Sequence, residues 1–383
     1  MVEWPHNRRI IMDAKYSRRA CTGSGMDPGP SIPRSSSYDH RKNLRWSSPT
    51  VRLRSVILAV GLCVGLAESA DAGRLEVIRQ RGFLACGVSP GVSGFSEVDN
   101  QGRYTGFDID MCRALAAAIF GTPEKVRFVR AESVQDFIKS NQIDVVSRRL
   151  TWSLTREGLG LLFGPITFYD GQGFLLPKRI RVSNARQLAG KKICVAPGTL
   201  SEFNVGFYFR TNQLDLKKVF VTVEELANAF NTGRCDAYTA DVSELGAMRR
   251  KLPSPNEYQI LSEQISKEPL AQVVRSDDVP FFDILRWTVF AIINAEELGI
   301  NSRNVDDMLK STNPDVQRLL GVTAGNGRSL GLDEKWAYQV IKTLGNYGEI
   351  FARTVGDRSA IKLDRGFNRL WTDGGLIYAP PLR

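Results

Sequence analysis

The chain has 383 residues, 43% of them hydrophobic and 24% charged, which is enough apolar sequence for one large or two ordinary packed domains. Its two histidines, His6 and His40, both precede residue 50. Histidine nucleophile systems, histidine general bases and most zinc sites are therefore excluded from the rest of the chain. The net charge of +10 is mild for this length and forms no basic stripe with aromatic partners, so no nucleic-acid partner is predicted.

The front of the chain is typical of an exported protein. Residues 1–50 are rich in Arg, Ser, Pro and Gly and are interpreted as a disordered or non-translated extension. Residues 51–72 have the layout of a signal peptide: basic Arg52 and Arg54, an uncharged apolar run, and Ala70-Asp-Ala72, after which we expect cleavage. The apolar run, residues 56–67, is shorter than the roughly 20 residues that a membrane span needs. We therefore expect the mature protein to be exported; the resemblance described below implies the periplasm as its location.

The mature chain keeps four cysteines: Cys86, Cys112, Cys194 and Cys235. Four cysteines allow three pairings, and the spacing favours two local disulfides, Cys86 with Cys112 and Cys194 with Cys235. Four buried free thiols are the alternative. No CxxC spacing supports a metal site and no P-loop or GxGxxG pattern supports a nucleotide, so no metal or cofactor is predicted.

Strands and helices are predicted to alternate, and part of the pattern occurs twice. The first unit has strands over 84–88, 126–129 and 143–147 and helices over 108–120 and 133–139. The second has strands over 192–196, 219–221 and 235–241, a helix opening at 199 and a helix over 224–231. Such alternation predicts an α/β fold of two lobes with parallel sheets and crossover helices. A ligand cleft is expected outside the carboxyl ends of the strands.

Three groups at these strand ends suit a zwitterionic ligand. Arg156, which follows Ser147, Arg149 and Thr151, offers a planar fork for a carboxylate. Thr199 opens a helix whose N-terminus supplies free N–H donors. Asp241 follows a strand and is placed to hold an ammonium. An α-amino acid is the simplest ligand that fits all three.

Each of these residues also has an ordinary structural interpretation. Arg156 fits a surface pair with Glu157, and Asp241 fits the N-cap of a helix that starts at Val242. Thr199 stands in a common turn. Phe95, like Trp152 and Tyr169, is interpreted either as core or as a surface on which the ligand stacks.

The chain from about residue 74 to 383 resembles the periplasmic solute-binding proteins of polar amino-acid ABC transporters (family 3), and especially their general L-amino-acid binding subgroup. Among the motifs that carry the resemblance are Gly106-Phe-Asp-Ile-Asp-Met-Cys112, Asp144-Val-Val-Ser-Arg148, Thr151-Trp-Ser-Leu-Thr-Arg156, Phe168-Tyr-Asp-Gly-Gln-Gly-Phe174, Gly233-Arg-Cys-Asp-Ala-Tyr-Thr-Ala-Asp241 and Gly345-Asn-Tyr-Gly-Glu-Ile-Phe351.

The resemblance implies a two-lobed periplasmic binding protein-like fold of type II, with a hinge and an interlobe cleft. Lobe 1 would be residues 74–171 and 269–383, and lobe 2 residues 172–268. Arg156 would hold the α-carboxylate, assisted by backbone N–H groups of Thr151, Thr199 and Leu200, and Asp241 would hold the α-ammonium. The implied partners are L-amino acids and the membrane permease subunits of an ABC transporter, with a monomeric receptor that is not an enzyme.

Two departures from the subgroup bear on the ligand. Ser-Arg-Asn-Thr-Thr-Trp is usual there, whereas this chain has Ser147-Arg-Arg149-Leu150-Thr-Trp, and Leu200 replaces a usual Thr. A diverged binding protein with a changed ligand is therefore one alternative. A periplasmic dehydratase-like enzyme on the same scaffold is another, in which only a carboxylate such as Glu202 or Asp241 would serve as acid or base. A ligand-sensing domain of a larger receptor or murein hydrolase is the third.

Overall fold

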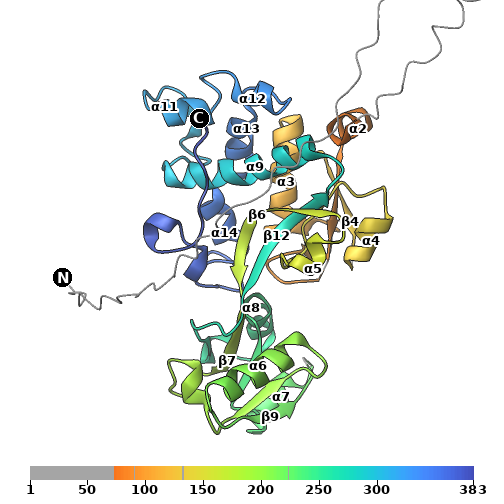
Figure 1. The fold of residues 1–383 in the computed structure, drawn as a ribbon. Helices are drawn as coiled ribbons and strands as arrows, with labels where there is room; N and C mark the ends of the chain where they lie inside the picture. The colour runs from red at the N-terminus through yellow and green to blue at the C-terminus, as the bar shows by residue number, and fades with distance from the viewer. Residues whose placement is uncertain (1–72, 90, 132, 223) are drawn as a thin grey trace, which may run out of the picture. The chain divides into compact units, whose positions relative to one another are not determined.

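The computed structural model describes residues 73–89, 91–131, 133–222 and 224–383 (Figure 1). The interpretations of residues 1–50 as an extension and of 51–72 as a signal peptide lie outside the described residues. All described residues belong to one compact unit. None of the helices among them combines the length and the apolar character that crossing a membrane requires.

Two five-stranded sheets organise the molecule, in the orders β4-β1-β5-β12-β6 and β11-β7-β10-β8-β9. The strands of the first sheet are β1 (Leu84–Val88), β4 (Val126–Arg130), β5 (Val145–Val146), β6 (Leu161–Asp170) and β12 (Glu268–Arg275). Those of the second are β7 (Gln172–Pro177), β8 (Lys192–Val195), β9 (Lys217–Phe220), β10 (Ala237–Asp241) and β11 (Tyr258–Ile260). A separate hairpin pairs β2 (Glu97–Val98) with β3 (Tyr104–Thr105).

Both sheets are mixed, which corrects the expectation of parallel sheets. The strands of the predicted repeats are indeed parallel, β1 with β4 and β5, and β8 with β9 and β10. The strands that join the two sheets run the other way: β12 is antiparallel to β6, and β7 to β10. The chain passes between the sheets from β6 to β7 and again just before β12. Because β6 and β10 end near these crossings whereas β12 and β7 begin there, each adjacent pair runs in opposite directions.

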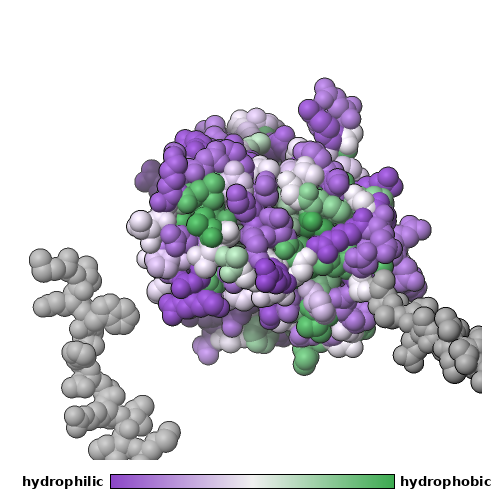
Figure 2. Space-filling view, turned by 90° about the horizontal axis from the view of Figure 1, so that it is seen from above, coloured by the Kyte–Doolittle hydropathy of each residue, from purple (hydrophilic) through white to green (hydrophobic). Residues whose placement is uncertain are grey.

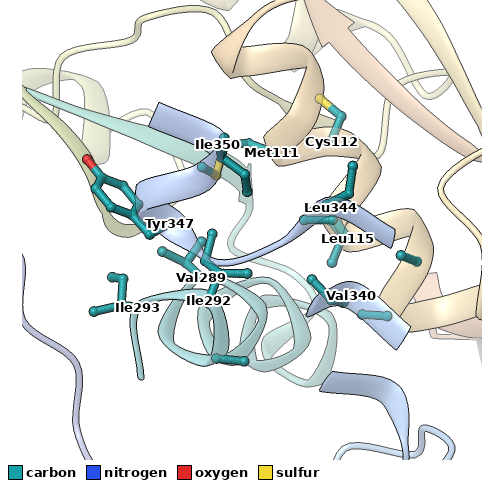
Figure 3. Close-up of a cluster of buried hydrophobic side chains, with 14 of the residues drawn as sticks. Met111, Cys112, Leu115, Val289, Ile292, Ile293, Val340, Leu344, Tyr347 and Ile350 are labelled. Carbon is teal, nitrogen blue, oxygen red and sulfur yellow. The ribbon is translucent and has the colours of Figure 1, made fainter. Parts of the chain in front are cut away.

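Helices flank the sheets. In chain order they are α2 (Arg74–Arg81), α3 (Phe107–Phe120), α4 (Val134–Lys139), α5 (Leu154–Glu157), α6 (Leu200–Thr211), α7 (Leu226–Asn231), α8 (Val242–Lys251), α9 (Val279–Glu297), α10 (Val305–Met308), α11 (Pro314–Leu319), α12 (Asn326–Ser329), α13 (Trp336–Leu344) and α14 (Tyr347–Thr354). Figure 3 shows how α3, α9, α13 and α14 pack through side chains such as Leu115, Val289, Val340 and Ile350, all at most 1% exposed. This cluster is the centre of the larger hydrophobic core.

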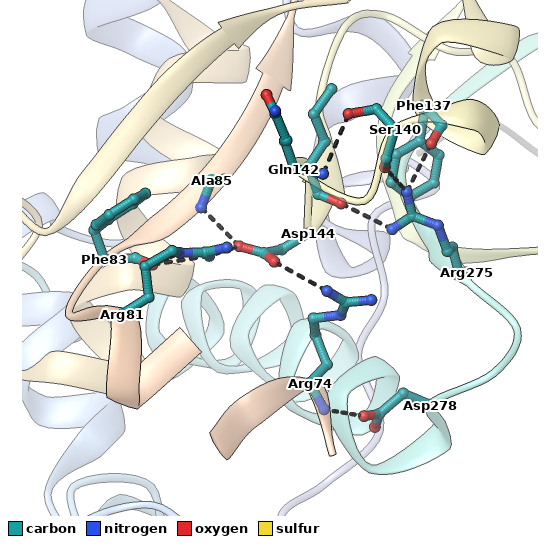
Figure 4. Close-up of polar contacts among 11 residues, drawn as sticks. Arg74, Arg81, Phe83, Ala85, Phe137, Ser140, Gln142, Asp144, Arg275 and Asp278 are labelled. Carbon is teal, nitrogen blue, oxygen red and sulfur yellow. Dashed lines mark hydrogen bonds and ion pairs between the residues drawn. The ribbon is translucent and has the colours of Figure 1, made fainter. Parts of the chain in front are cut away.

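An equivalent aspartate-to-backbone hydrogen bond occurs in both predicted repeats. Asp144, just before β5, accepts from the backbone N–H of Ala85 at 2.8 Å. Asp236, just before β10, accepts from the backbone N–H of Lys192, also at 2.8 Å. Each carboxylate thus ties the start of one parallel strand to its neighbour. Asp144 is buried and also pairs with Arg81 and Arg74, which anchors α2 (Figure 4).

Both predicted disulfides are confirmed: Cys86 bonds Cys112 and Cys194 bonds Cys235, with Cα–Cα distances of 6.2 and 5.6 Å. The first fastens β1 to α3, and the second fastens β8 to the segment before β10. On the face shown in Figure 2, hydrophilic residues predominate and hydrophobic ones form separate patches between them.

Candidate functional site

Two acidic residues mark the places where the chain crosses between the sheets. Asp170 ends β6 and Glu268 begins β12, and the two are opposite one another in the antiparallel pairing. They are 4% and 9% exposed. Like charges that face each other across strands destabilise a sheet, so this pair needs nearby donors or cations.

Asp170 supplies the helix cap that was one of the two interpretations of Asp241. Its Oδ1 accepts from the backbone N–H of Gly171 at 2.9 Å and from that of Ser243, in the first turn of α8, at 3.2 Å. Asp241 occupies the N-cap position of α8 but makes no side-chain cap hydrogen bond. The carboxylate of Asp241 is therefore left available to a ligand.

The surroundings of Asp241 disfavour its negative charge. Burial, and secondly the negative charges of neighbouring acids, together raise the pKa of this carboxyl to about 7. The acids are Asp170, Glu268 and Glu244, while Arg149 acts in the opposite direction. A cation that arrived beside Asp241 would relieve this repulsion, which is the property expected of an ammonium site.

Arg156 lies on the one-turn helix α5, whose N-cap is Ser153. The Arg156 guanidinium donates to the backbone carbonyl of Thr151 at 2.7 Å, which holds it against the start of its own loop. Glu157, the alternative partner, instead accepts from Trp152 Nε1 at 3.1 Å. Thr151 in turn donates its hydroxyl to Glu268 at 2.7 Å, so a chain of contacts connects Arg156 with the acidic crossing.

Arg149 reaches from the first sheet's loop to the second sheet's helix. Its guanidinium donates to Ser243 Oγ at 2.9 Å and lies 5.7 Å from the centre of the Phe95 ring. Ser147 does not face α8 in this way, because its hydroxyl donates to Asp108 at 3.0 Å. Burial raises the pKa of Asp108 to about 6, and the hydrogen bond from Ser147 partly offsets that rise.

The remaining predicted residues divide between core and helix terminus. Phe95 is 1% exposed and packs edge-on against Phe107 and Phe168, so it belongs to the core and only its face toward Arg149 adjoins the site. Thr199 is the N-cap of α6 and its oxygen accepts from the backbone N–H of Glu202. Leu200 opens that helix and is 63% exposed.

Gln172 connects α6 with β10, the strand that ends at Asp241. It was not among the site residues predicted from the sequence. Its Nε2 donates at 2.8 Å both to the carbonyl of Ser201 and to Thr239 Oγ1. It also stands opposite Asp241 in the pairing of β7 with β10. Its buried Oε1 has no hydrogen-bond partner among the residues that the structure describes, which makes it a second acceptor beside Asp241.

Asp170, Glu268 and Asp108 were also missed as site residues. The only signal for the first two was their position at the two crossings. In the described part of the chain no cluster of His, Cys, Asp or Glu has the makings of a metal site. The site residues are the Arg156 guanidinium on α5, the Arg149 guanidinium that contacts α8, and the N-terminus of α6. Several carboxylates also surround Asp241. This arrangement suits the binding of a small ligand that carries an ammonium.

Comparison with known proteins agrees with this chemistry. The family model of bacterial extracellular solute-binding proteins, family 3, matches residues 84–300. The chain belongs to this family. Its two-sheet α/β architecture is the two-lobed fold of such proteins.

Relatives of this solute-binding protein match over nearly their whole length. It is 46% identical to the general L-amino acid-binding periplasmic protein AapJ of Rhizobium johnstonii, with 86% of this chain and 98% of the relative covered. It is 44% identical to the putative amino-acid ABC transporter-binding protein YhdW of Escherichia coli, with 87% and 98% covered. A solved ABC transporter periplasmic binding protein from Brucella ovis, with glutathione bound, is 45% identical over 82% of this chain and 100% of that chain, with a TM-score of 0.72.

Proposed function

We propose that this solute-binding protein is the extracytoplasmic receptor of an ABC uptake transporter and that it binds L-amino acids by their zwitterionic head. In this proposal Arg156 holds the α-carboxylate, with N–H donors at Thr151, Thr199 and Leu200. Asp241 holds the α-ammonium. Residues 74–171 with 269–383 form one lobe and residues 172–268 the other, and the lobes close on the ligand.

The observation that carries the proposal is the state of Asp241. It stands at a helix N-cap, yet Asp170 performs the capping, and burial among further acids raises the pKa of the Asp241 carboxyl to about 7. An acid in this setting gains most from a bound cation. The names of the relatives, which describe amino-acid-binding and ABC transporter-binding proteins, supply the ligand class and the partner.

The same relationship supports two further parts of the proposal, delivery of the ligand to a membrane permease and a location in the periplasm after removal of a signal peptide. The receptor is expected to act as a monomer and without catalysis. Both AapJ and YhdW are named for binding, not for a reaction.

Titration calorimetry with the twenty L-amino acids tests the site, using protein that has been unfolded and refolded to remove any ligand acquired during expression. Arg156→Ala and Asp241→Asn should each weaken binding about 100-fold, because each leaves a charged ligand group without its partner. Asp241→Asn is informative because it removes the charge with almost no change in side-chain size, while Asp170 continues to cap α8. Asp215→Asn, an exposed acid elsewhere in the second lobe, is the matched control.

A second ligand class deserves the same titration. The related Brucella protein carries glutathione, which presents an α-ammonium and an α-carboxylate on its glutamyl residue as an amino acid does. Glutathione also carries a second carboxylate, for which Arg149 provides a cation beside the proposed site. Binding of glutathione that is lost in Asp241→Asn would place it in the same cleft. Binding that survives this substitution would contradict a shared site.

A further inference from the structure

Arg149 holds an unusual backbone conformation at the edge of the proposed site. Its φ of 54° lies in the left-handed region, which costs free energy for any residue with a side chain as large as arginine's. The turn is fastened on both sides of this residue, because the Ser147 hydroxyl donates to Asp108 and the Arg149 guanidinium donates to Ser243 Oγ. The contact with Ser243 directs the arginine toward α8.

The side chain extends from the first sheet's loop to the start of α8. Its Nη1 donates to Ser243 Oγ, and Ser243 is fully buried and donates its backbone N–H to Asp170. One face of the guanidinium lies over the Phe95 ring. A guanidinium has five N–H donors, and the Ser243 contact uses only one position of the fork.

Arg149 also acts on both carboxylates that flank the proposed ammonium site. Its charge favours the ionised forms of Asp170 and Asp241. Ser243, which Arg149 contacts, is two residues beyond Asp241 at the start of α8, so a ligand whose ammonium rests on Asp241 has its remaining substituents within electrostatic reach of Arg149. In a partly dehydrated cleft, one unit charge at about 8 Å contributes roughly 1 kcal/mol, or about fivefold in affinity.

We propose that Arg149 sets the charge selectivity of the cleft, favouring ligands whose side chain carries a carboxylate and disfavouring those whose side chain carries a cation. The inference rests on the proposed function, because it takes the ammonium at Asp241 as its reference point. It assigns to the departure at position 149 a definite consequence: acidic ligands bind best, neutral ones less well and basic ones worst.

The experiment measures the dissociation constants of L-glutamate, L-glutamine and L-lysine for the refolded parent protein and for four variants. Arg149→Asn removes the cation and introduces a residue that tolerates a positive φ. If the Arg149→Asn protein has a lower melting temperature than the parent, Arg149→Gly, which removes the backbone strain, is used in its place. Arg149→Lys keeps the charge. Ser243→Ala removes the contact across the cleft but not the cation. Arg303→Asn, an exposed arginine outside the site, matches the change in net charge.

For the parent, L-glutamate should bind about 25-fold more tightly than L-lysine, with L-glutamine between them. Arg149→Asn should reduce this ratio to threefold or less, whereas Arg149→Lys, Ser243→Ala and Arg303→Asn should preserve it. An unchanged ratio in Arg149→Asn overturns the inference and leaves amino-acid binding intact. A parent that binds none of the twenty L-amino acids overturns the proposed function itself, and the inference with it.

Discussion

The pH dependence of ligand binding tests the role of Asp241 in depth. In the free protein the pKa of its carboxyl is raised to about 7, mainly by burial and then by the acids Asp170, Glu268 and Glu244. A bound ammonium favours the ionised form and lowers that pKa in the complex. Between the two pKa values the free protein holds more protons than the complex, so ligand binding releases a proton. The affinity must therefore fall as the pH is lowered through about 7.

The size of the effect follows from the free protein's pKa. Below it, each pH unit weakens binding tenfold until the pKa of the complex is reached. Between pH 8 and pH 5 the dissociation constant for a neutral amino acid should rise about 100-fold, which corresponds to about 2.7 kcal/mol. The ligand's own α-carboxylate and α-ammonium keep their charges over most of this range, so the change reports on the protein.

Calorimetry in buffers of different ionisation enthalpy measures both the affinity and the number of protons released. We expect about half a proton released at pH 7, and a pH-independent affinity for whatever binding remains in Asp241→Asn. Asp108, whose pKa is raised to about 6, is the competing group. A midpoint near 6 that persists in Asp241→Asn would assign the titration to Asp108. An affinity that is flat from pH 5 to 8 in the parent would refute the reasoning on Asp241.

Three further predictions concern stability. Without ligand, Asp241→Asn should stabilise the protein by up to about 4 kcal/mol at pH 8 in urea unfolding, and by little at pH 4. An acid whose pKa is higher in the folded than in the unfolded protein opposes folding increasingly as the pH rises from about 4 to 7. Asp144→Asn should lower the free energy of unfolding by about 3 kcal/mol, since it disturbs a buried carboxylate with two arginine partners. Asp236→Asn alters the equivalent but less buried contact and should lower it by about 1 kcal/mol, and equal losses in the two variants would contradict this account. Replacing Cys194 and Cys235 together by Ser should lower the unfolding free energy by about 4 kcal/mol, as expected for a loop of 41 residues, and a loss below about 1 kcal/mol would show that the bond does not restrain the unfolded chain.

The repeated units could be predicted because their signals are local. The strand over 84–88 and the helix that ends at Phe120 follow from apolar runs, hydrophobic period and the glycine that follows the helix. The pairing of Cys194 with Cys235 followed from spacing. The direction of β12 could not be predicted, because an antiparallel return depends on where the chain re-enters a sheet nearly a hundred residues after leaving it.

Only those site residues whose type and position suggest a function could be predicted from the sequence. Arg156 and Asp241 stand out by type and position, but the capping preference assigned Asp241 to α8 as readily as to a ligand. The structure separates these roles through Asp170, which is 73 residues from Ser243 in the chain and beside it in space. No short-range pattern contains that information.

In the proposed function, the acidic crossing couples the charge of the ligand to closure of the lobes. Asp170 and Glu268 face each other at the only two places where the described chain passes between the sheets, and Asp241 is within reach of both. Hydrogen bonds from Ser243 and Thr151 and the charge of Arg149 hold this cluster together without neutralising it. In the proposed function, the ligand's ammonium completes the neutralisation at the two crossings that connect the lobes. In the proposed function, part of the binding free energy then shifts the population toward the closed form, to the extent that this form binds the ammonium more tightly than the open form does.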